Sequence, residues 1–438
     1  MKLRFVCAAL VGACVLPVSA QDQVILPSTV DPAVLAIESR VIEWRRDFHQ
    51  HPELSNREFR TAGIVADHLR SLGMEVQTGV AHTGVIGILR GSKPGPVIAL
   101  RADMDALPVT ERNDLPFRSE AVGEYLGSEV GVMHACGHDT HVAMLMGAAE
   151  ILASMKSELP GTIKFIFQPA EEGVPPGERG GAELMVEEGV LTAPDVEAVF
   201  GLHIDSQLDI GKIQYRPEGI MASVQDFRIV VNGRQAHGST PWFGVDPIVT
   251  AAQIINNLQT VVSRSSKLTR AAAVVTVGKI EGGVRSNIIP ERVEMVGTIR
   301  TLDDDMRAVV HRRIREIAEH TAASNGATVT VEIPMSASYP VTYNDPALTA
   351  RMLPSLQRAA GPSNVLLVDA ETGAEDFSFF ANQVPGLYWF VGGKPLDIPS
   401  DEAPSHHTPD FYLDEDGMRT GIQSFLNVAL DYLGGGAR

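Results

Sequence analysis

The chain has 438 residues, of which 44% are hydrophobic, 21% charged and 6% aromatic. This composition excludes a disordered or collagen-like chain. The length exceeds what one hydrophobic core usually supports, so we expect two domains. A formal net charge of −18 argues against nucleic acid and anionic membranes as partners.

The first twenty residues have the features of a cleaved secretory signal. Lys2 and Arg4 precede an apolar run over residues 5–17, and Val18 and Ala20 suit a signal peptidase. A membrane anchor is the alternative, but the run is shorter than the ~20 residues that span a bilayer. A lipoprotein beginning at Cys14 is a second alternative. We predict a signal peptide over residues 1–20 and an exported protein, periplasmic or secreted, without a membrane anchor after cleavage.

Cleavage would leave a single cysteine in the mature chain. Cys7 and Cys14 lie in the predicted signal, so Cys136 has no partner for an intrachain disulfide. An unpaired thiol is a liability in an oxidising compartment. This indicates that Cys136 binds a metal, has a chemical task or is simply buried.

Residues 30–220 alternate helical and extended patterns. Helical spacing covers residues 30–71, and a helix is expected over 142–155. The expected strands are 75–77, 84–90, 97–102 and 161–168. Alternating helices and buried strands predict an α/β sheet with its site at the carboxyl ends of the strands.

The pattern changes between residues 221 and 333. Strands are expected over 225–231, 272–280, 292–301 and 328–333, and helices over 247–262 and 306–322. This β-α-β-β-α-β order is the ferredoxin-like arrangement. Residues 334–438, with a helix over 346–360 and a strand over 388–391, are expected to return to the first domain.

Residues 133–141, Met-His-Ala-Cys-Gly-His-Asp-Thr-His, follow an irregular stretch and open a helix. Cys136 and His138 are metal-ligand types, and Gly137 between them allows a tight turn. Taken alone, a Cys-x-His pair is weak evidence, because a buried cysteine beside a histidine is commonplace.

Two adjacent carboxylates follow an apolar strand. Residues 163–167 run directly into Gln-Pro-Ala-Glu-Glu-Gly, which contains Glu171 and Glu172. Like charges at this position repel unless a cation or a shared proton compensates, so surface solvation fits poorly. Neighbouring residues of an extended chain point opposite ways, so one carboxylate can bind metal while the other faces a reacting water. The pair therefore predicts metal-assisted hydrolysis.

Histidines follow in two further segments. His203 comes at the expected end of the apolar strand 198–202, and His406 and His407 lie in a polar loop before the final helix. Each histidine alone is more often structural than a ligand. Together with the cysteine motif and the glutamate pair, they predict a metal site.

With these motifs the sequence resembles the peptidase M20 amidohydrolases, and among them the hippurate hydrolases, aminoacylase-like enzymes and auxin-conjugate hydrolases. The matching segments are residues 101–108 (Arg-Ala-Asp-Met-Asp-Ala-Leu-Pro), 134–141, 168–173, 201–203, 236–237, 287–290, 297–301, 373–377 and 407–409. The resemblance implies an α/β fold with a binuclear-metal catalytic domain. It also implies that residues 221–333 form an inserted ferredoxin-like α+β lid and dimerisation domain.

The resemblance further implies a set of metal ligands. Two divalent metal ions per subunit would be held by Cys136, His138, Glu172, His203 and His407. Cysteine and histidine ligands favour zinc, although manganese, cobalt and nickel also fit. Glu171 would be the general base that takes a proton from a metal-bridging water and passes it to the leaving amine.

Other roles implied by the resemblance lie outside the ligand set. Asp105 would orient a ligand, and Asp103 fits a structural role equally well. His237 would reach the active site of a partner subunit and stabilise the oxyanion, which requires a homodimer or a higher homo-oligomer. Asn287 would contact substrate, and Arg300 would pair with its carboxylate. A satisfied loop histidine and a solvated strand arginine are the competing readings of His237 and Arg300.

The leading hypothesis is an enzyme that cleaves the amide bond of a small N-acyl or N-aroyl amino acid. Candidate aromatic residues for its pocket are Phe117, Trp242, Phe377 and Phe379. A metallo-carboxypeptidase or dipeptidase of the same family is the main alternative. A thiol hydrolase with Cys136 as nucleophile and a non-catalytic binding protein are weaker ones.

Overall fold

The computed structural model describes residues 32–336 and 338–435. The predicted signal peptide lies outside the described residues. Among the helices of the described ranges, none has the length and apolar character needed to cross a membrane.

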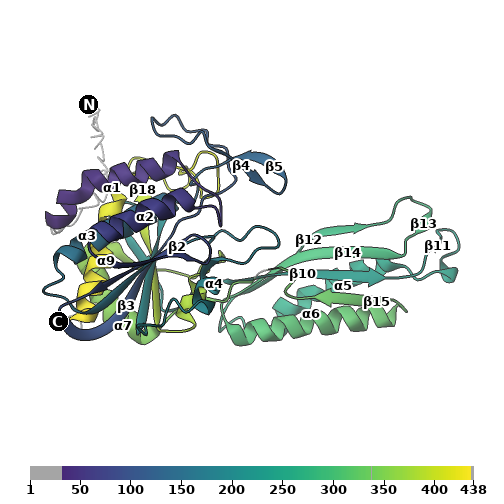
Figure 1. The fold of residues 1–438 in the computed structure, drawn as a ribbon. Helices are drawn as coiled ribbons and strands as arrows, with labels where there is room; N and C mark the ends of the chain where they lie inside the picture. Colours follow the sequence, from purple (N-terminus) through teal and green to yellow (C-terminus); the bar gives the residue numbers. More distant parts are fainter. Residues whose placement is uncertain (1–31, 337, 436–438) are drawn as a thin grey trace, which may run out of the picture.

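The first domain is built on an eight-stranded sheet with the order β1-β2-β6-β3-β7-β18-β8-β17 (Figure 1). The strands are β1 (Glu75–Val80), β2 (Gly84–Arg90), β3 (Lys93–Asp103), β6 (Pro160–Gln168), β7 (Ala198–Asp209), β8 (Ile213–Tyr215), β17 (Val365–Leu367) and β18 (Gly386–Lys394). The central strands β6, β3, β7 and β18 are mutually parallel. Their carboxyl ends therefore meet at one edge of the sheet, as expected for a site of this fold class.

Helices cover this sheet. They are α1 (Pro32–Gln50), α2 (Phe59–Ser71), α3 (His138–Ser154), α4 (Gly181–Glu187), α7 (Pro346–Ala360), α8 (Ser378–Ala381) and α9 (Gly417–Leu433). Helix α3 is apolar nearly all round and packs against α1, α9 and the central strands, as expected for a fully buried helix. Because α3 starts at His138, this packing fixes the position of the cysteine–histidine motif at its amino end.

Residues between β9 (Glu218–Met221) and β16 (Thr342–Asn344) contain a second sheet with the order β12-β14-β10-β15. Its elements are β10 (Ser223–Asn232), α5 (Pro247–Thr260), β12 (Ala273–Gly282), β14 (Arg292–Thr301), α6 (Asp304–Ser324) and β15 (Thr328–Glu332). Together they enclose a separate hydrophobic core. The chain order is β-α-β-β-α-β, so the predicted fold class, α/β with an inserted ferredoxin-like α+β domain, is confirmed.

The inserted domain extends from the first domain as an arm (Figure 1). At its far end the short strands β11 (Ala236–His237) and β13 (Ile288–Ile289) pair beside the 3-10 turn η1 (Pro241–Phe243). We call this region the arm tip. At the near end, the two chain connections pair with each other through Val224 and Tyr339.

Two expected elements differ from the structure. The helical pattern over 30–71 is divided into α1 and α2 by the irregular segment 51–58. Pro52, the second residue of this segment, cannot continue the hydrogen bonding of a helix. Strand β7 does not end at His203 but continues to Asp209, because β18 pairs with it beyond that point. The hairpin of β4 (Val122–Tyr125) and β5 (Ser128–Gly131) had no counterpart in the sequence analysis.

Candidate metal centre

The turn between Cys136 and His138 requires glycine. Gly137 has φ 93°, a left-handed conformation that disfavours other residues. A Cβ at this position would also lie 2.5 Å from Cγ2 of Ile204. The turn therefore places Cys136 just before α3 and His138 on its first turn, with both side chains at the carboxyl edge of the sheet.

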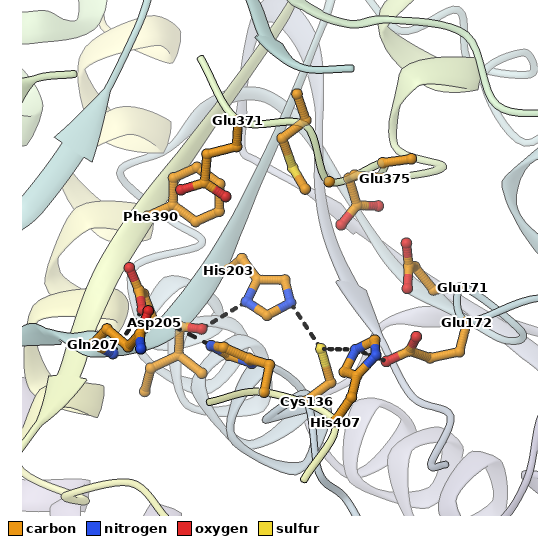
Figure 2. A pocket seen from close by; sticks show the side chains of 15 residues that line it. Cys136, Glu171, Glu172, His203, Asp205, Gln207, Glu371, Glu375, Phe390 and His407 are labelled. Carbon is orange, nitrogen blue, oxygen red and sulfur yellow. Dashed lines mark hydrogen bonds and ion pairs between the residues drawn. The ribbon is translucent and has the colours of Figure 1, made fainter. Parts of the chain in front are cut away.

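Cys136 lies between two histidines from distant segments. Its Sγ is 3.3 Å from Nε2 of His203 on β7 and 3.3 Å from Nε2 of His407 in the loop before α9 (Figure 2). Nε2 of His407 lies 3.2 Å from Oε1 of Glu172. Four of the five predicted ligands therefore form a continuous chain of neighbouring polar atoms.

His138, the fifth predicted ligand, faces the same carboxylate. Its Nδ1 donates to the backbone oxygen of Asp105 at 2.9 Å. Its Nε2 is fully buried, finds no hydrogen-bond partner among the described residues and lies 3.8 Å from Oε1 of Glu172. A buried nitrogen left without a partner is costly, and a metal ion would satisfy it.

These separations suit metal ligands. Zinc bonds of about 2.3 Å to sulfur and about 2.1 Å to nitrogen, at tetrahedral angles, place such atoms about 3.6 Å apart. Cys136, Glu172 and His407 form one group whose ligand atoms lie within 4.8 Å of one another, and His138, Glu171 and Glu172 form another. With Nε2 of His203 beside Cys136, the donor atoms of these groups would suit two divalent cations.

The ring of His203 is oriented for this role. Its Nδ1 donates to the backbone oxygen of Ile204 at 2.6 Å, which leaves Nε2 directed at Cys136. Burial holds the pKa of His203 well below its usual value, so the ring is neutral, as a ligand must be.

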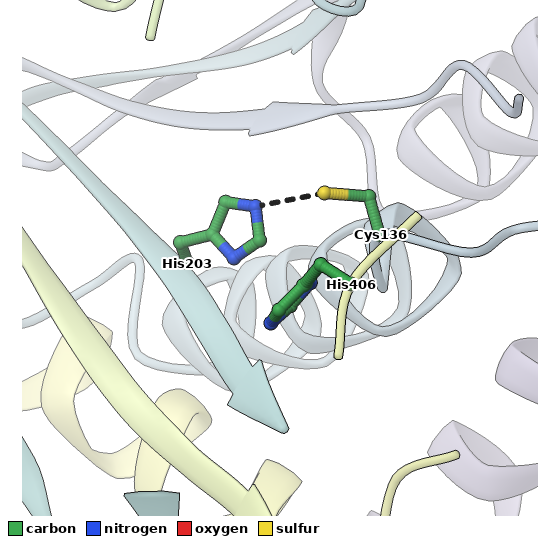
Figure 3. Close-up of side chains that lie close together, drawn as sticks. All are labelled: Cys136, His203 and His406. Atoms are coloured by element: carbon green, nitrogen blue, oxygen red, sulfur yellow. Dashed lines mark hydrogen bonds between the residues drawn. The ribbon is translucent and has the colours of Figure 1, made fainter. Parts of the chain in front are cut away.

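His406 also lies beside Cys136 and His203 (Figure 3). Its Nε2 accepts a hydrogen bond from the backbone N–H of Ser206 at 3.2 Å. Burial lowers the pKa of His406 to about 3. His406 is therefore a neutral neighbour of the cluster with one ring nitrogen already used.

His141 is close to the cluster but has no free nitrogen. Its Nδ1 donates to Oδ1 of Asp103 at 2.6 Å, and its Nε2 accepts from the N–H of Ile204 at 2.8 Å. The second oxygen of Asp103 accepts from Arg101 at 2.6 Å. His141 therefore has no ring nitrogen left for a metal, and Asp103 holds it in place.

Asp105 lies behind the predicted ligands and contacts several of the neighbouring groups. Its carboxylate accepts from the backbone N–H groups of Glu171 and Glu172, each at 3.0 Å, and from Oγ of Ser55 at 2.7 Å. Its Oδ1 also lies 3.3 Å from Nδ1 of His138. Asp105 thus orients a ligand and both glutamates at once.

Glu171 is buried among other acids. Burial and the carboxylates of Glu375, Glu172 and Asp376 hold the pKa of Glu171 well above its usual value. Its backbone oxygen accepts from the hydroxyl of Tyr339 at 2.8 Å. A carboxyl group with a raised pKa beside a metal site is suited to accept and return a proton.

A buried arginine compensates part of this acidity. Arg101 on β3 donates to Gln168 at 2.7 Å, Asp103 at 2.6 Å, Glu375 at 2.8 Å and Asp376 at 3.0 Å. The sequence analysis included Arg101 in a matching segment without giving it a role. An arginine within an otherwise apolar strand was the available signal, since a buried cation requires carboxylate partners.

A cavity of about 310 Å³ opens on the cluster. Figure 2 shows Glu171, Glu172 and Glu375 on one side of His203, and Asp205 and Gln207 on the other. Met221 and Phe390 supply apolar lining, and no lysine or arginine is among the described residues that line it. The aromatic candidates Phe117, Trp242, Phe377 and Phe379 do not line this cavity. For Phe117, Phe377 and Phe379 the prediction was wrong, because position near a motif in sequence does not fix where a ring points. For Trp242, which lies in the inserted domain near His237, it stays a prediction.

Three predicted site residues belong to the inserted domain and do not line the cavity. His237 and Asn287 are exposed at the arm tip, where the N–H of Gly238 donates to the backbone oxygen of Asn287 at 2.8 Å. Arg300 is half-buried on β14 and donates to the backbone oxygen of Ile299 at 3.1 Å. Burial lowers its pKa. Within one chain, these residues are not brought to the metal ligands.

An α/β domain with metal-ligand side chains at its sheet edge and an inserted α+β domain defines a class of metal-dependent hydrolases. Residues 99–431 match Peptidase family M20/M25/M40, and the chain belongs to this family. The chain is therefore a hydrolase of the amide-cleaving type, as the sequence analysis predicted.

Relatives of known description span nearly the whole chain. Thermostable carboxypeptidase 2 of Saccharolobus solfataricus is 40% identical over 91% of this chain and 97% of its own. N-acetylcysteine deacetylase of Bacillus subtilis is 37% identical over 90% and 97%. The crystal structure of Bacillus subtilis YXEP protein, described as a dinuclear metal binding peptidase from the M20 family, superimposes with a TM-score of 0.75. It is 35% identical and covers 91% of this chain and 99% of its own.

Proposed function

We propose that this protein is a two-metal amidohydrolase that cleaves N-acyl or N-aroyl amino acids. The observation that carries the proposal is the arrangement of the two adjacent glutamates. Glu172 belongs to both groups of potential ligand atoms, while Glu171, the residue before it, belongs to one group and lines the cavity together with Glu172. Adjacent carboxylates with different surroundings can take different roles.

Cys136, His138, Glu172, His203 and His407 would hold two divalent ions. When bound, such ions lower the pKa of water towards ~7 and polarise the scissile carbonyl. Zinc is the ion proposed, since thiolate and imidazole are its preferred ligands. Manganese, cobalt and nickel are the alternatives to test.

Glu171 would act as the general base. Its carboxylate lines the cavity beside the proposed ligands, where it could take a proton from the attacking water and deliver it to the leaving amine. Asp105 would hold this arrangement in place through the N–H groups of Glu171 and Glu172.

The substrate's carboxylate needs a partner that the cavity lacks. Since no lysine or arginine is among the described lining residues, the inserted domain is the proposed source, with Arg300 and Asn287 contacting substrate. His237 would stabilise the oxyanion in the site of a partner subunit. The proposed mechanism therefore requires the protein to form at least a homodimer.

The arm supports association in two ways. Strand β12 is an edge strand of its sheet within the described part of the chain, and such edges readily pair with another chain. The arm tip exposes large apolar side chains: Trp242 is 71%, Phe243 67% and Val284 91% exposed. Exposed patches of this kind are typical of protein interfaces.

The thiol-hydrolase alternative is disfavoured by the surroundings of Cys136. Burial and the carboxylates of Glu172 and Glu171 hold the pKa of its thiol well above the usual value. A nucleophilic cysteine requires the opposite shift. Without a cation, Cys136 stays protonated.

A carboxypeptidase or dipeptidase is the second candidate. Asp205 and Glu371 line the cavity, and carboxylates favour a substrate with a free amine over an acylated one. The similarity to a thermostable carboxypeptidase supports the same alternative.

The protein is proposed to act after export, as its first twenty residues predict.

A substrate panel with metal counting tests the proposal. Protein lacking residues 1–20 is assayed on N-acetyl and N-benzoyl amino acids and on dipeptides, before and after chelation, with its mass measured by light scattering. We expect two metals per chain, loss of activity on chelation and recovery with a divalent ion. Faster cleavage of dipeptides would favour the carboxypeptidase. Undiminished hydrolysis by metal-free protein would overturn the metal site.

A further inference from the structure

Glu58 is a buried carboxyl group without an assigned role. Its side chain is 0% exposed and lies just before α2. Its Oε1 accepts from the N–H groups of Asn56 at 3.0 Å and Ala170 at 2.9 Å. Its Oε2 accepts from Oγ1 of Thr83 at 2.6 Å. Glu58 therefore joins three segments that are far apart in sequence.

This position is costly for an acidic side chain. The three described donors are neutral, and a buried carboxyl group gains less from neutral donors than from a cation. Burial and the nearby Asp105 raise the pKa of Glu58 to about 8. In every described side-chain hydrogen bond, however, the carboxyl group of Glu58 is the acceptor. Its structural role is therefore to hold the donors on Asn56, Thr83 and Ala170.

The contact with Ala170 is the one that reaches the candidate active site. Ala170 has φ 53°, a left-handed conformation that residues with a side chain rarely adopt. The N–H groups of the next two residues, Glu171 and Glu172, donate to Asp105. Three consecutive backbone N–H groups are thus held by two buried acids, Glu58 and Asp105.

The strained residue directly precedes the general base. Ala170 turns the chain out of β6, so its φ and ψ angles set the direction in which the following residue leaves the sheet. If the N–H of Ala170 lost its acceptor, the left-handed conformation would lose its support. Asp105 would still accept from the N–H groups of both glutamates, but Glu172 would in addition be held by a metal. The shift is therefore expected at the side chain of Glu171, next to the altered turn.

We propose that Glu58 is a positioning residue for Glu171, acting through the N–H of Ala170. The inference rests on the proposed function, because it assigns Glu58 to the proton-transfer step. Glu58 does not touch substrate or metal, so its removal should lower kcat without changing substrate affinity or metal content.

The test compares two substitutions at Glu58. In Glu58→Ala the acceptor is lost, and we expect kcat to fall by on the order of 10²-fold, with KM within about twofold and metal content unchanged. In Glu58→Gln the amide oxygen can still accept from Ala170 and Asn56, while its NH₂ donates to Thr83. We expect this variant to retain most of the wild-type kcat.

Glu53 provides a matched control in the same loop. Its carboxylate accepts from the N–H groups of Arg60 at 2.9 Å and Thr61 at 2.8 Å at the start of α2. None of its described hydrogen bonds reaches residues 170–172. Glu53→Ala should therefore lower the thermal unfolding temperature and leave kcat unchanged.

Several outcomes would overturn the inference. These are an unchanged kcat in Glu58→Ala, a loss of metal from that variant, or a Glu58→Gln variant as impaired as Glu58→Ala. If Glu58→Ala does not fold, Glu58→Asp replaces it. Asp keeps the acid but is one methylene shorter, so the same fall in kcat is expected.

A crystal structure separates this inference from the proposed function. In metal-loaded Glu58→Ala we expect Ala170 to leave the left-handed region and the Glu171 side chain to move, with the metal ligands in place. An unaltered loop would overturn the positioning role even if the enzyme's substrate is unknown. Wild-type protein that hydrolyses no amide in the panel would overturn the proposed function and leave the structural result standing.

Discussion

The metal cluster and the arm tip are built in opposite ways. Around the cluster, the side chains from β7, α3 and the nearby loops are buried or half-buried, except His407, which is exposed. Asp105 and Arg101 hold polar groups around them. At the arm tip, His237 is exposed on a two-residue strand. One chain supplies all the described residues of the first region, whereas the role proposed for the second depends on association with another chain.

The largest effect should come from the cluster itself. Glu171→Gln removes the proton acceptor but keeps the shape of the side chain, so kcat should fall by about 10²–10⁴-fold with two metals still bound. Glu172→Gln is the comparison, since it should lose metal as well as activity. Activity and metal content are measured on the same samples. Unchanged turnover in Glu171→Gln would remove Glu171 from the mechanism.

A substitution at the arm tip should lower the activity of the active site in the partner subunit, not of the site in its own chain. His237→Ala should lower kcat by about 10²–10³-fold if it removes an oxyanion donor. Mixing it with Glu171→Gln, after dissociation and reassociation, should restore about a quarter of wild-type activity. Random pairing makes half of the dimers mixed, and each mixed dimer has one intact site. No recovery would mean that His237 does not act across subunits.

A smaller loss of activity is expected from substitution of Asp105, which lies behind the predicted ligands. Asp105→Ala leaves the N–H groups of Glu171 and Glu172 without their acceptor and removes the carboxylate beside His138, whose ring still donates to the backbone oxygen of residue 105. Metal affinity or kcat/KM should therefore fall by about 10–100-fold. Ser55→Ala removes only one donor to Asp105 and should cost less. Metal titration of both apo variants gives the comparison. Equal affinities would show that Asp105 does not orient the ligands.

The smallest effect should come from the connection to the arm. Tyr339→Phe removes one hydroxyl bond to the backbone of Glu171, worth about 0.5–1.5 kcal/mol, so kcat should fall by no more than about tenfold. Tyr343→Phe, at an exposed position nearby in sequence, is the control. A loss as large as that of Glu171→Gln would indicate that the arm controls the base more strongly than this contact implies.

The cluster was largely predictable because its residues follow local patterns. Glu171 and Glu172 come directly after an apolar strand, and Gly137 between Cys136 and His138 marks a tight turn before a helix. The end of β7 was not predictable, since β18, from a distant part of the chain, extends it past His203. Residues of the inserted domain could be named from resemblance but not placed relative to the cavity.

The amino-acid sequence was sufficient to establish the family, the order of the elements and the metal-ligand types, because apolar periodicity and adjacent polar motifs are local properties. The roles of Glu58, Arg101 and Tyr339 were not accessible from it. Each depends on which distant N–H, carboxylate or backbone oxygen lies within about 3 Å. That choice is made when the sheet and its loops pack together.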